Sequence, residues 1–211
     1  MDDSEFDLVM KIVIVGDTSV GKTNLLLRYC KDTFSTDTKA TIGIDFFTKD
    51  ILIQERSVKV QFWDTAGQEK YQSISHTYYK MVSGVLLVYD ITRADTFAKV
   101  EMLLGEIHRF CPTDVKIMLI GNKKDLQSER EVTIEKASKF AEDNSLFFWE
   151  TSALTNSEMC VFRAFDGLLG ECLNGLVIDK SSESLLEIKK KYVELQIDGR
   201  DKKNRKSCCG N

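Results

Sequence analysis

Three short segments of the chain are almost continuously apolar and have the length of a β-strand: KIVIVG (11–16), GVLLVYDI (84–91) and VKIMLIG (115–121). Segments that are apolar on both faces are typical of parallel strands covered by helices on both sides. LFFWETS (146–152) adds another strand. The amphipathic stretches between these segments predict helices, so an α/β protein is expected. The helices are expected at about 22–30, 95–109, 133–144 and 157–173.

A different pattern lies between the first two apolar segments. IDFFTKDILI (44–53) and SVKVQFW (57–63) flank the turn-like QER, and apolar Val58, Val60 and Phe62 alternate with polar residues. A period of two indicates a strand with one exposed face, and the two segments predict a β-hairpin. We therefore expect a six-stranded, mostly parallel sheet with one antiparallel edge strand and helices on both faces.

The regular alternation of strands and helices ends near residue 175. This predicts one compact domain, 1–175, and a polar tail, 176–211. A length of 211 residues, of which 43% are hydrophobic, is enough for one such domain and a tail. The tail carries one apolar stripe, which fits either a marginal helix or a disordered linker. The stripe consists of Leu185, Ile188, Tyr192 and Leu195.

Charge and cysteine content exclude several classes of function. A net charge of −4 argues against a nucleic-acid-binding protein, so no nucleic-acid partner is expected. The acidic N-terminal sequence, whose apolar run is broken by Lys11, favours neither a signal peptide nor a membrane span. The six cysteines form no CxxC pair and, with two histidines, do not complete a zinc site. We expect a reduced, cytosolic protein in which Cys30, Cys111, Cys160 and Cys172 are ordinary buried or half-buried residues.

GDTSVGKT (16–23), directly after the first apolar segment, matches the phosphate-loop pattern G-x-x-x-x-G-K-[ST]. In such a loop backbone N–H groups cradle phosphates, Lys22 contacts the β- and γ-phosphates, and the Thr23 hydroxyl binds Mg²⁺. A chance glycine turn is the alternative, which the flanking strand and helix disfavour. The predicted phosphate-binding residues of the loop are Asp17, Thr18, Ser19, Val20, Gly21, Lys22 and Thr23.

GNKKD (121–125) indicates which base is bound. A carboxylate at Asp125 accepts hydrogen bonds from N1–H and the exocyclic amine of guanine, whereas adenine offers neither donor. A charged surface turn is the alternative for NKKD alone, but ETSAL (150–154) follows another strand and completes a guanine pocket. The predicted guanine-binding residues are Phe34, Asn122, Lys123, Asp125, Ser152, Ala153 and Leu154.

WDTAGQE (63–69) supplies groups for hydrolysis. Asp64 is placed to hold Mg²⁺ through water, the Gly67 N–H to meet the γ-phosphate, and Gln68 to orient the attacking water, which makes it the catalytic residue. Thr41 is the candidate that completes the Mg²⁺ shell and senses the third phosphate. The expected ligands are therefore GTP or GDP with Mg²⁺. The predicted metal-binding residues are Thr23, Thr41 and Asp64.

In their order along the chain, five features resemble those of the Ras superfamily of small GTPases over about residues 8–175: GDTSVGKT, Thr41 in ATIGIDF, WDTAGQE, GNKKD and ETSAL. IGIDF (42–46), FWDTAGQE (62–69) and LLVYDIT (86–92) are similar to the Rab family in particular, and TNLLLRY, IMLIGNKKDL and ETSAL to its recycling-endosome branch. The resemblance implies a Ras-like P-loop fold, GTP hydrolysis with Mg²⁺, and a switch that regulates intracellular vesicle trafficking. It also implies an effector patch between two switch segments, for whose aromatic residues burial in the core is the alternative. The patch consists of Ile42, Gly43, Phe46, Trp63 and Tyr78.

The resemblance further implies a set of partners. They are a guanine-nucleotide exchange factor, a GTPase-activating protein, a GDP-dissociation inhibitor, a Rab escort protein, a geranylgeranyl transferase and trafficking effectors. No arginine lies in the phosphate loop or in the first switch after Arg28. We therefore expect a slow enzyme that depends on an arginine supplied in trans.

Three features depart from the family's usual sequence. YYKMVSG (78–84) replaces a YYRGA-like stretch, so residues 80–82 are expected to alter the effector surface beyond the second switch. Thr18 and Ser19 stand where glycine is often found, and their side chains are expected to crowd the transition state and slow intrinsic hydrolysis. Leu154 replaces a common lysine, which matters little if the base is bound by backbone N–H.

Other functions remain open from the sequence. A binding module that stays loaded with GTP and rarely hydrolyses it is favoured by Thr18 and Ser19 and disfavoured by Gln68. A P-loop kinase or ATPase of another class is disfavoured by NKKD and ETSA. A Ras- or Rho-type signalling protein is a third possibility with the same biochemistry.

The chain ends in KSCCGN (206–211), whose two cysteines have several possible roles. A zinc site lacks ligands, a disulfide between adjacent cysteines is strained, and free thiols are the remaining alternative. Cys208 is placed for C-a-a-X prenylation, but Gly210 is not aliphatic; the resemblance instead implies geranylgeranyl groups on both Cys208 and Cys209. The basic segment 200–206 favours binding to a membrane leaflet that contains anionic lipids. We expect a protein held at the cytoplasmic face of an endomembrane, such as the recycling endosome or trans-Golgi, with a cytosolic pool.

Overall fold

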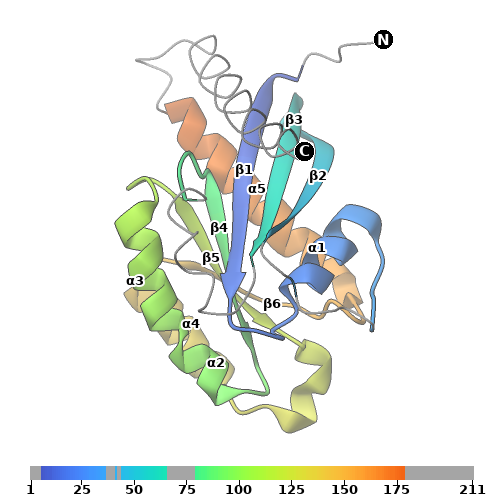
Figure 1. The fold of residues 1–211 in the computed structure, drawn as a ribbon, viewed down its shortest axis with the longest axis vertical. Helices are drawn as coiled ribbons and strands as arrows, with labels where there is room; N and C mark the ends of the chain where they lie inside the picture. Colours follow the sequence, from blue (N-terminus) through green and yellow to red (C-terminus); the bar gives the residue numbers. More distant parts are fainter. Residues whose placement is uncertain (1–5, 37–40, 42–43, 66–78, 179–211) are drawn as a thin grey trace, which may run out of the picture. The chain divides into compact units, whose positions relative to one another are not determined.

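The computed structural model describes residues 6–36, 41, 44–65 and 79–178 (Figure 1). The chain separates into two compact units, Met1–Cys172 and Leu173–Asn211. The fold below is that of the first unit. The tail predicted at 176–211 lies almost wholly outside the described residues, and its boundary near residue 175 stays a prediction.

Six strands form one sheet in the order β2-β3-β1-β4-β5-β6. Only β2 and β3 are antiparallel, and every other neighbouring pair is parallel. The predicted α/β fold with one antiparallel edge strand is therefore confirmed. The strands are β1 (Leu8–Gly16), β2 (Ile44–Ile53), β3 (Arg56–Thr65), β4 (Gly84–Asp90), β5 (Lys116–Asn122) and β6 (Phe147–Glu150).

The antiparallel edge is the hairpin that alternation predicted. Ile53 pairs with Arg56, so a two-residue turn joins the strands, and both turn residues, Gln54 and Glu55, have positive φ (49° and 63°). Two successive left-handed residues match the right-handed twist of the flanking strands. The turn residues did not indicate the hairpin, because this turn lacks the asparagine or glycine that is usual in such turns. The hairpin was predictable only from the alternation of apolar and polar residues in the flanking strands.

Helices cover both faces of the sheet (Figure 1). On one face α2, α3 and α4 pack over a buried apolar cluster that includes Val85, Leu87 and Val100. On the other face the Tyr29 ring of α1 lies 5.5 Å from Phe62 of β3 and 4.5 Å from Phe165 of α5, measured between centroids. The helices are α1 (Lys22–Lys31), α2 (Ala94–Ala98), α3 (Val100–Phe110), α4 (Ile134–Asp143) and α5 (Cys160–Ile178), with short 3₁₀ helices η2 (Lys124–Glu129) and η3 (Ser157–Met159).

One predicted helix is wrong in detail. The single helix expected at 95–109 is divided at Lys99, which caps the end of α2 and the start of α3, although its φ of −77° and ψ of −14° stay in the right-handed helical region. The helix expected at 133–144 is confirmed as α4, whose first turn is capped by the Thr133 hydroxyl accepting from the Lys136 N–H at 3.2 Å. Capping by a threonine side chain fixes where this helix begins.

The four described cysteines are free thiols, two half-buried (Cys30, Cys111) and two buried (Cys160, Cys172), as predicted. Within the described ranges, no group of three or more His, Cys, Asp or Glu side chains could bind a metal ion by itself. No helix in these ranges is long and apolar enough to cross a bilayer.

Candidate functional site

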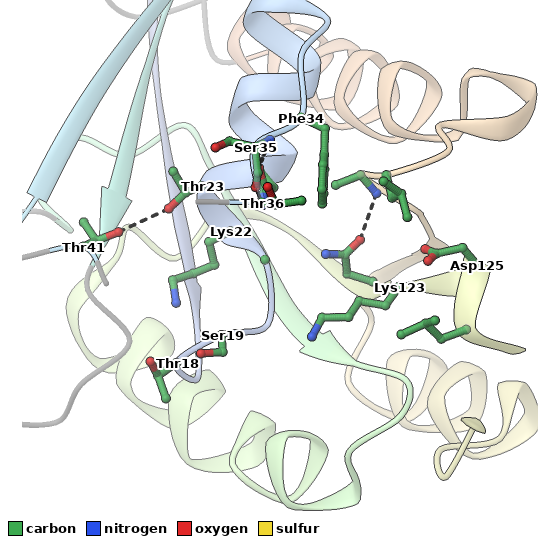
Figure 2. A pocket seen from close by; sticks show the side chains of 16 residues that line it. Thr18, Ser19, Lys22, Thr23, Phe34, Ser35, Thr36, Thr41, Lys123 and Asp125 are labelled. Carbon is green, nitrogen blue, oxygen red and sulfur yellow. Dashed lines mark hydrogen bonds between the residues drawn. The ribbon is translucent and has the colours of Figure 1, made fainter. Parts of the chain in front are cut away.

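A cavity of about 510 Å³ lies at the carboxyl edge of the parallel strands, where β1 and β5 end (Figure 2). This edge is where ligands bind in open α/β sheets, because helix N-termini and loops converge there. Twelve predicted site residues line the cavity: Thr18, Ser19, Gly21, Lys22, Thr23, Phe34, Thr41, Asn122, Lys123, Asp125, Ala153 and Leu154. Asn24, Ser35, Thr36 and Leu126 also line it and were not predicted.

The loop from Gly16 to Gly21 packs so closely against its neighbours that neither end has room for a side chain. A Cβ on Gly16 would overlap the carbonyl oxygen of Val88, and one on Gly21 would overlap the side-chain amide of Asn122. Gly21 also has a φ of 94°, which favours glycine. The two glycines of the motif are therefore required by close packing, and the segment between them has the sequence pattern of an anion-binding loop.

Lys22 is 6% exposed, and its ammonium donates to the carbonyl oxygens of Gly16 at 2.9 Å and Asp17 at 2.8 Å. Burial lowers the pKa of Lys22 to about 8, against the opposing charges of Asp64 and Asp17. A buried ammonium with only carbonyl partners lacks a full counter-charge. An anion in the cavity supplies one, so this end of the cavity fits phosphate.

Asp64 is fully buried beside two hydroxyls. The Thr23 hydroxyl donates to its Oδ2 at 2.5 Å and lies 3.2 Å from the Thr41 hydroxyl (Figure 2). Within the described part of the chain, the Oδ1 atom of Asp64 has no hydrogen-bond partner. Burial raises the pKa of Asp64, and the Thr23 hydrogen bond and Lys22 oppose that rise. One carboxylate with two hydroxyls suits Mg²⁺, which takes few protein ligands and completes its shell with water and phosphate oxygens.

The other end of the cavity is braced by Asn122. Its amide donates to the carbonyl of Val20 at 2.8 Å, and its Oδ1 accepts from the Thr151 hydroxyl at 3.3 Å and the Ala153 N–H at 3.4 Å. This one side chain thus joins the phosphate loop to the loop after β6. Its position follows from β5, at whose end it is buried.

Asp125 faces the cavity opposite Phe34 (Figure 2). Its Oδ1 accepts from the Ser152 hydroxyl at 2.5 Å, and that hydroxyl in turn accepts from the Thr155 N–H at 3.0 Å. A carboxylate oriented by a neighbouring hydroxyl is preorganised to accept two hydrogen bonds from one ligand edge. Lys123 has a left-handed φ of 68°, and its ammonium lies 2.6 Å from the buried Asp90 carboxylate.

Two sets of positioning contacts were missed in the sequence. Arg28 of α1 donates to the carbonyls of Ala153 at 3.0 Å and Leu154 at 3.1 Å, and so fixes the loop beside the predicted base site. Two cations that follow β4 in the chain approach the Asp17 carboxylate. The Lys99 ammonium, between α2 and α3, lies 2.8 Å from it, and the Arg93 guanidinium, just before α2, lies 4.0 Å from it. No local pattern marks these residues, although an acidic residue inside a phosphate loop is a signal that a cation lies nearby.

The predicted effector patch is described only in part. The Phe46 ring, 47% exposed, lies edge-on to Trp63 at 5.4 Å between centroids, which disfavours burial of Phe46 in the core. Beyond the second switch Met81 has a left-handed φ of 56°, where the family's usual stretch has glycine. Several predicted residues lie outside the described part of the chain: Ile42, Gly43, Gly67, Gln68, Tyr78, Cys208 and Cys209.

Comparison with known proteins identifies the family. The model of the Ras family matches residues 11–173. Ras-related protein RABA5b of Arabidopsis thaliana is 43% identical over 197 residues, which cover 93% of this chain and 88% of the relative. Ras-related protein Rab11C of Nicotiana tabacum is 45% identical over 155 residues, 74% of this chain and 70% of the relative.

These findings confirm the family and the Rab11-like branch that the motifs predicted. The cavity supplies the matching geometry, since a lysine-bearing loop stands at one end and a carboxylate at the other. The chain belongs to the Ras family and is a GTP-binding small GTPase of the Rab type, a GTP hydrolase.

Proposed function

We propose that this protein is a Mg²⁺-dependent GTP switch that regulates vesicle traffic from the cytoplasmic face of an endomembrane. The observation that carries the proposal is the cavity in which Lys22 and Asp125 stand at opposite ends (Figure 2). A cation at one end and an anion at the other match a ligand with phosphates at one end and hydrogen-bond donors at the other.

Asp125 confers the preference for guanine. Its carboxylate accepts from N1–H and the exocyclic amine of guanine, while adenine leaves the same oxygens unpaired in a partly closed site. Phe34 and the stem of Lys123 line the space where the base lies. The Ala153 N–H completes the pocket, and Arg28 holds that segment in place.

At the other end Lys22 binds the β- and γ-phosphates in exchange for its two loop carbonyls. Thr23, Thr41 and Asp64 would hold Mg²⁺, and the free Oδ1 of Asp64 fits that assignment. The ion, when bound, neutralises charge that develops on the phosphates. Thr41 meets the ion only when a third phosphate is present, so its segment responds to hydrolysis.

Gln68 and Gly67, outside the described residues, act in hydrolysis by orienting water and contacting the γ-phosphate. Thr18 and Ser19 line the phosphate end, where their side chains crowd the transition state. We expect slow intrinsic hydrolysis and acceleration of about a thousandfold or more by an arginine from a GTPase-activating protein.

The membrane role rests on the tail and the family. Geranylgeranyl groups on Cys208 and Cys209, added by a geranylgeranyl transferase with a Rab escort protein, anchor the chain with help from the basic segment 200–206. A GDP-dissociation inhibitor, an exchange factor and trafficking effectors complete the cycle. Intact-mass spectrometry of protein from cells tests the anchor, because unmodified Cys208 and Cys209 contradict it.

Competition between GTP and ATP for a fluorescent guanine nucleotide tests the core of the proposal. GTP is expected to compete and ATP to fail, and Asp125→Asn is expected to weaken guanine binding by at least about tenfold. Asp114→Asn, which removes an exposed carboxylate before β5, is the matched control. Equal competition by ATP, or equal affinity of both variants, would contradict the proposal.

A GTP-loaded binding module with little hydrolysis is the second candidate, favoured by the Thr18 and Ser19 side chains in the cavity. Single-turnover phosphate release distinguishes the two. A switch releases phosphate at a slow but measurable rate that Gln68→Leu abolishes, whereas the binding module shows no release that depends on Gln68.

A further inference from the structure

Asp17 is the one acidic residue in the phosphate loop Gly16–Thr23, and it is almost fully buried. Its Oδ1 accepts from the Thr18 N–H at 2.7 Å, and its Oδ2 accepts from the Lys99 ammonium at 2.8 Å. The guanidinium of Arg93 lies 4.0 Å from the same Oδ2. Both carboxylate oxygens are therefore engaged.

A buried carboxylate at this place poses an electrostatic problem. The loop binds the phosphates of a nucleotide, and a second negative charge beside them repels the ligand and is costly to desolvate. Lys22 compensates this charge only in part, because its ammonium contacts the backbone carbonyl of Asp17 and not the carboxylate. The remaining compensating charge comes from behind the loop, from Lys99 and Arg93.

Lys99 is held by a rigid part of the fold. It stands at the junction of α2 and α3, between buried Phe97 and Val100. The Phe97 ring packs on Tyr89 at 4.9 Å and Phe140 at 5.6 Å between centroids. The junction that broke the predicted helix thus places a cation against the phosphate loop, while 46% of the Lys99 side chain stays exposed.

We infer that Lys99 is a positioning residue of the nucleotide site, which acts through Asp17 to hold the first turn of the phosphate loop. The loop then has two anchors: Lys99 with Asp17 at its start, and Asn122 with the Val20 carbonyl near its end. Loss of Lys99 removes the closer of the two cations that face the buried Asp17 carboxylate next to the phosphates, so bound nucleotide leaves faster. The inference rests on the proposed binding of phosphates by this loop.

Release of a fluorescent GDP from the full-length protein tests the inference. Lys99→Met is expected to speed release by about threefold to tenfold, as for a half-exposed ion pair with one buried partner. Lys99→Arg is expected to restore the slow rate. Lys139→Met, which removes a lysine of equal charge paired with Asp143 on the exposed face of α4, is the matched control and should release GDP like the wild type.

A double-mutant cycle shows whether Lys99 acts through Asp17. In an Asp17→Asn background Lys99→Met should have almost no further effect, because the charge it compensates is gone. Equal release from Lys99→Met and Lys139→Met, or an undiminished effect in the Asp17→Asn background, overturns the inference while nucleotide binding stands. A wild-type protein that fails to bind fluorescent GDP overturns the proposed function as well.

Discussion

The Lys22 ammonium donates to two loop carbonyls, and burial lowers its pKa to about 8. Phosphates next to it favour the charged form and raise the pKa again. Nucleotide binding is therefore expected to take up protons at any pH at which the Lys22 side chain is partly neutral before binding.

We predict that GDP binding takes up protons at alkaline pH. At pH about 8.5 the free Lys22 is mostly neutral and the bound form charged, so about half a proton or more is taken up, and affinity falls as pH rises through about 8 to 10. Calorimetric titration without Mg²⁺, in two buffers that differ in ionisation enthalpy, measures this uptake. It should be smaller at pH about 7. An uptake that does not increase between the two pH values contradicts the prediction.

Single residues of the site were predictable where a local motif fixes their role. Lys22 and Asp125 follow from the loops that carry them, and both line the cavity. Arg28 and Lys99 were not predictable, because their partners Ala153 and Asp17 lie 125 and 82 residues away in sequence. Contacts of that separation depend on how helices pack on the sheet, which the sequence pattern does not specify.

At the scale of elements, packing decides what a given residue does. Gly105 is exposed in the middle of α3, and a Cβ there meets nothing within 4 Å. Gly84 begins β4 under α5, and a Cβ there would lie 2.8 Å from the Cys172 sulfur and 3.1 Å from Ile12 Cδ1. Substitution of glycine by alanine should thus have opposite effects on the free energy of unfolding in the helix α3 and in the strand β4.

We predict that Gly105→Ala raises the free energy of unfolding by about 0.5–1 kcal/mol, because alanine loses less backbone entropy in a helix. Gly84→Ala should lower it by about 1–3 kcal/mol through overpacking between sheet and helix. Urea unfolding at one fixed concentration of GDP measures both. A loss of stability in Gly105→Ala, or none in Gly84→Ala, would mean that the packing of α3 or β4 differs from this description.

The elements themselves were largely predictable from hydrophobic pattern. Strands β1, β4 and β5 are almost continuously apolar and mostly buried, whereas β3 of the hairpin alternates and has several half-buried positions. The break at Lys99 was not predictable, since residues 95–109 contain no proline and the amphipathic pattern continues through it. At the break Phe97 and Val100 are buried, and the Lys99 ammonium contacts the Asp17 carboxylate.

At the scale of the whole molecule, the site is assembled from loops that only the complete sheet brings together. The phosphate loop, the segment after α1, and the loops after β5 and β6 all line one cavity. A ligand that contacts all of them stabilises the folded chain by mass action. On the proposed assignment of Mg²⁺ to Asp64, part of that stabilisation belongs to the nucleotide and part to the metal, and a substitution of Asp64 separates the two.

We predict that GDP with Mg²⁺, at about a thousand times the dissociation constant, raises the unfolding midpoint by about 8–16 °C, which corresponds to about 4 kcal/mol for a domain of this size. A chelator should remove the metal-dependent part of this shift and leave the rest. In Asp64→Asn the chelator should change nothing, because the carboxylate with the free Oδ1 is gone, while GDP alone still stabilises the variant. Asp114→Asn, with an exposed carboxylate removed instead, should respond to the chelator as the wild type does. Thermal unfolding of the three proteins with and without chelator measures these shifts, and a chelator effect that survives in Asp64→Asn would place the metal elsewhere.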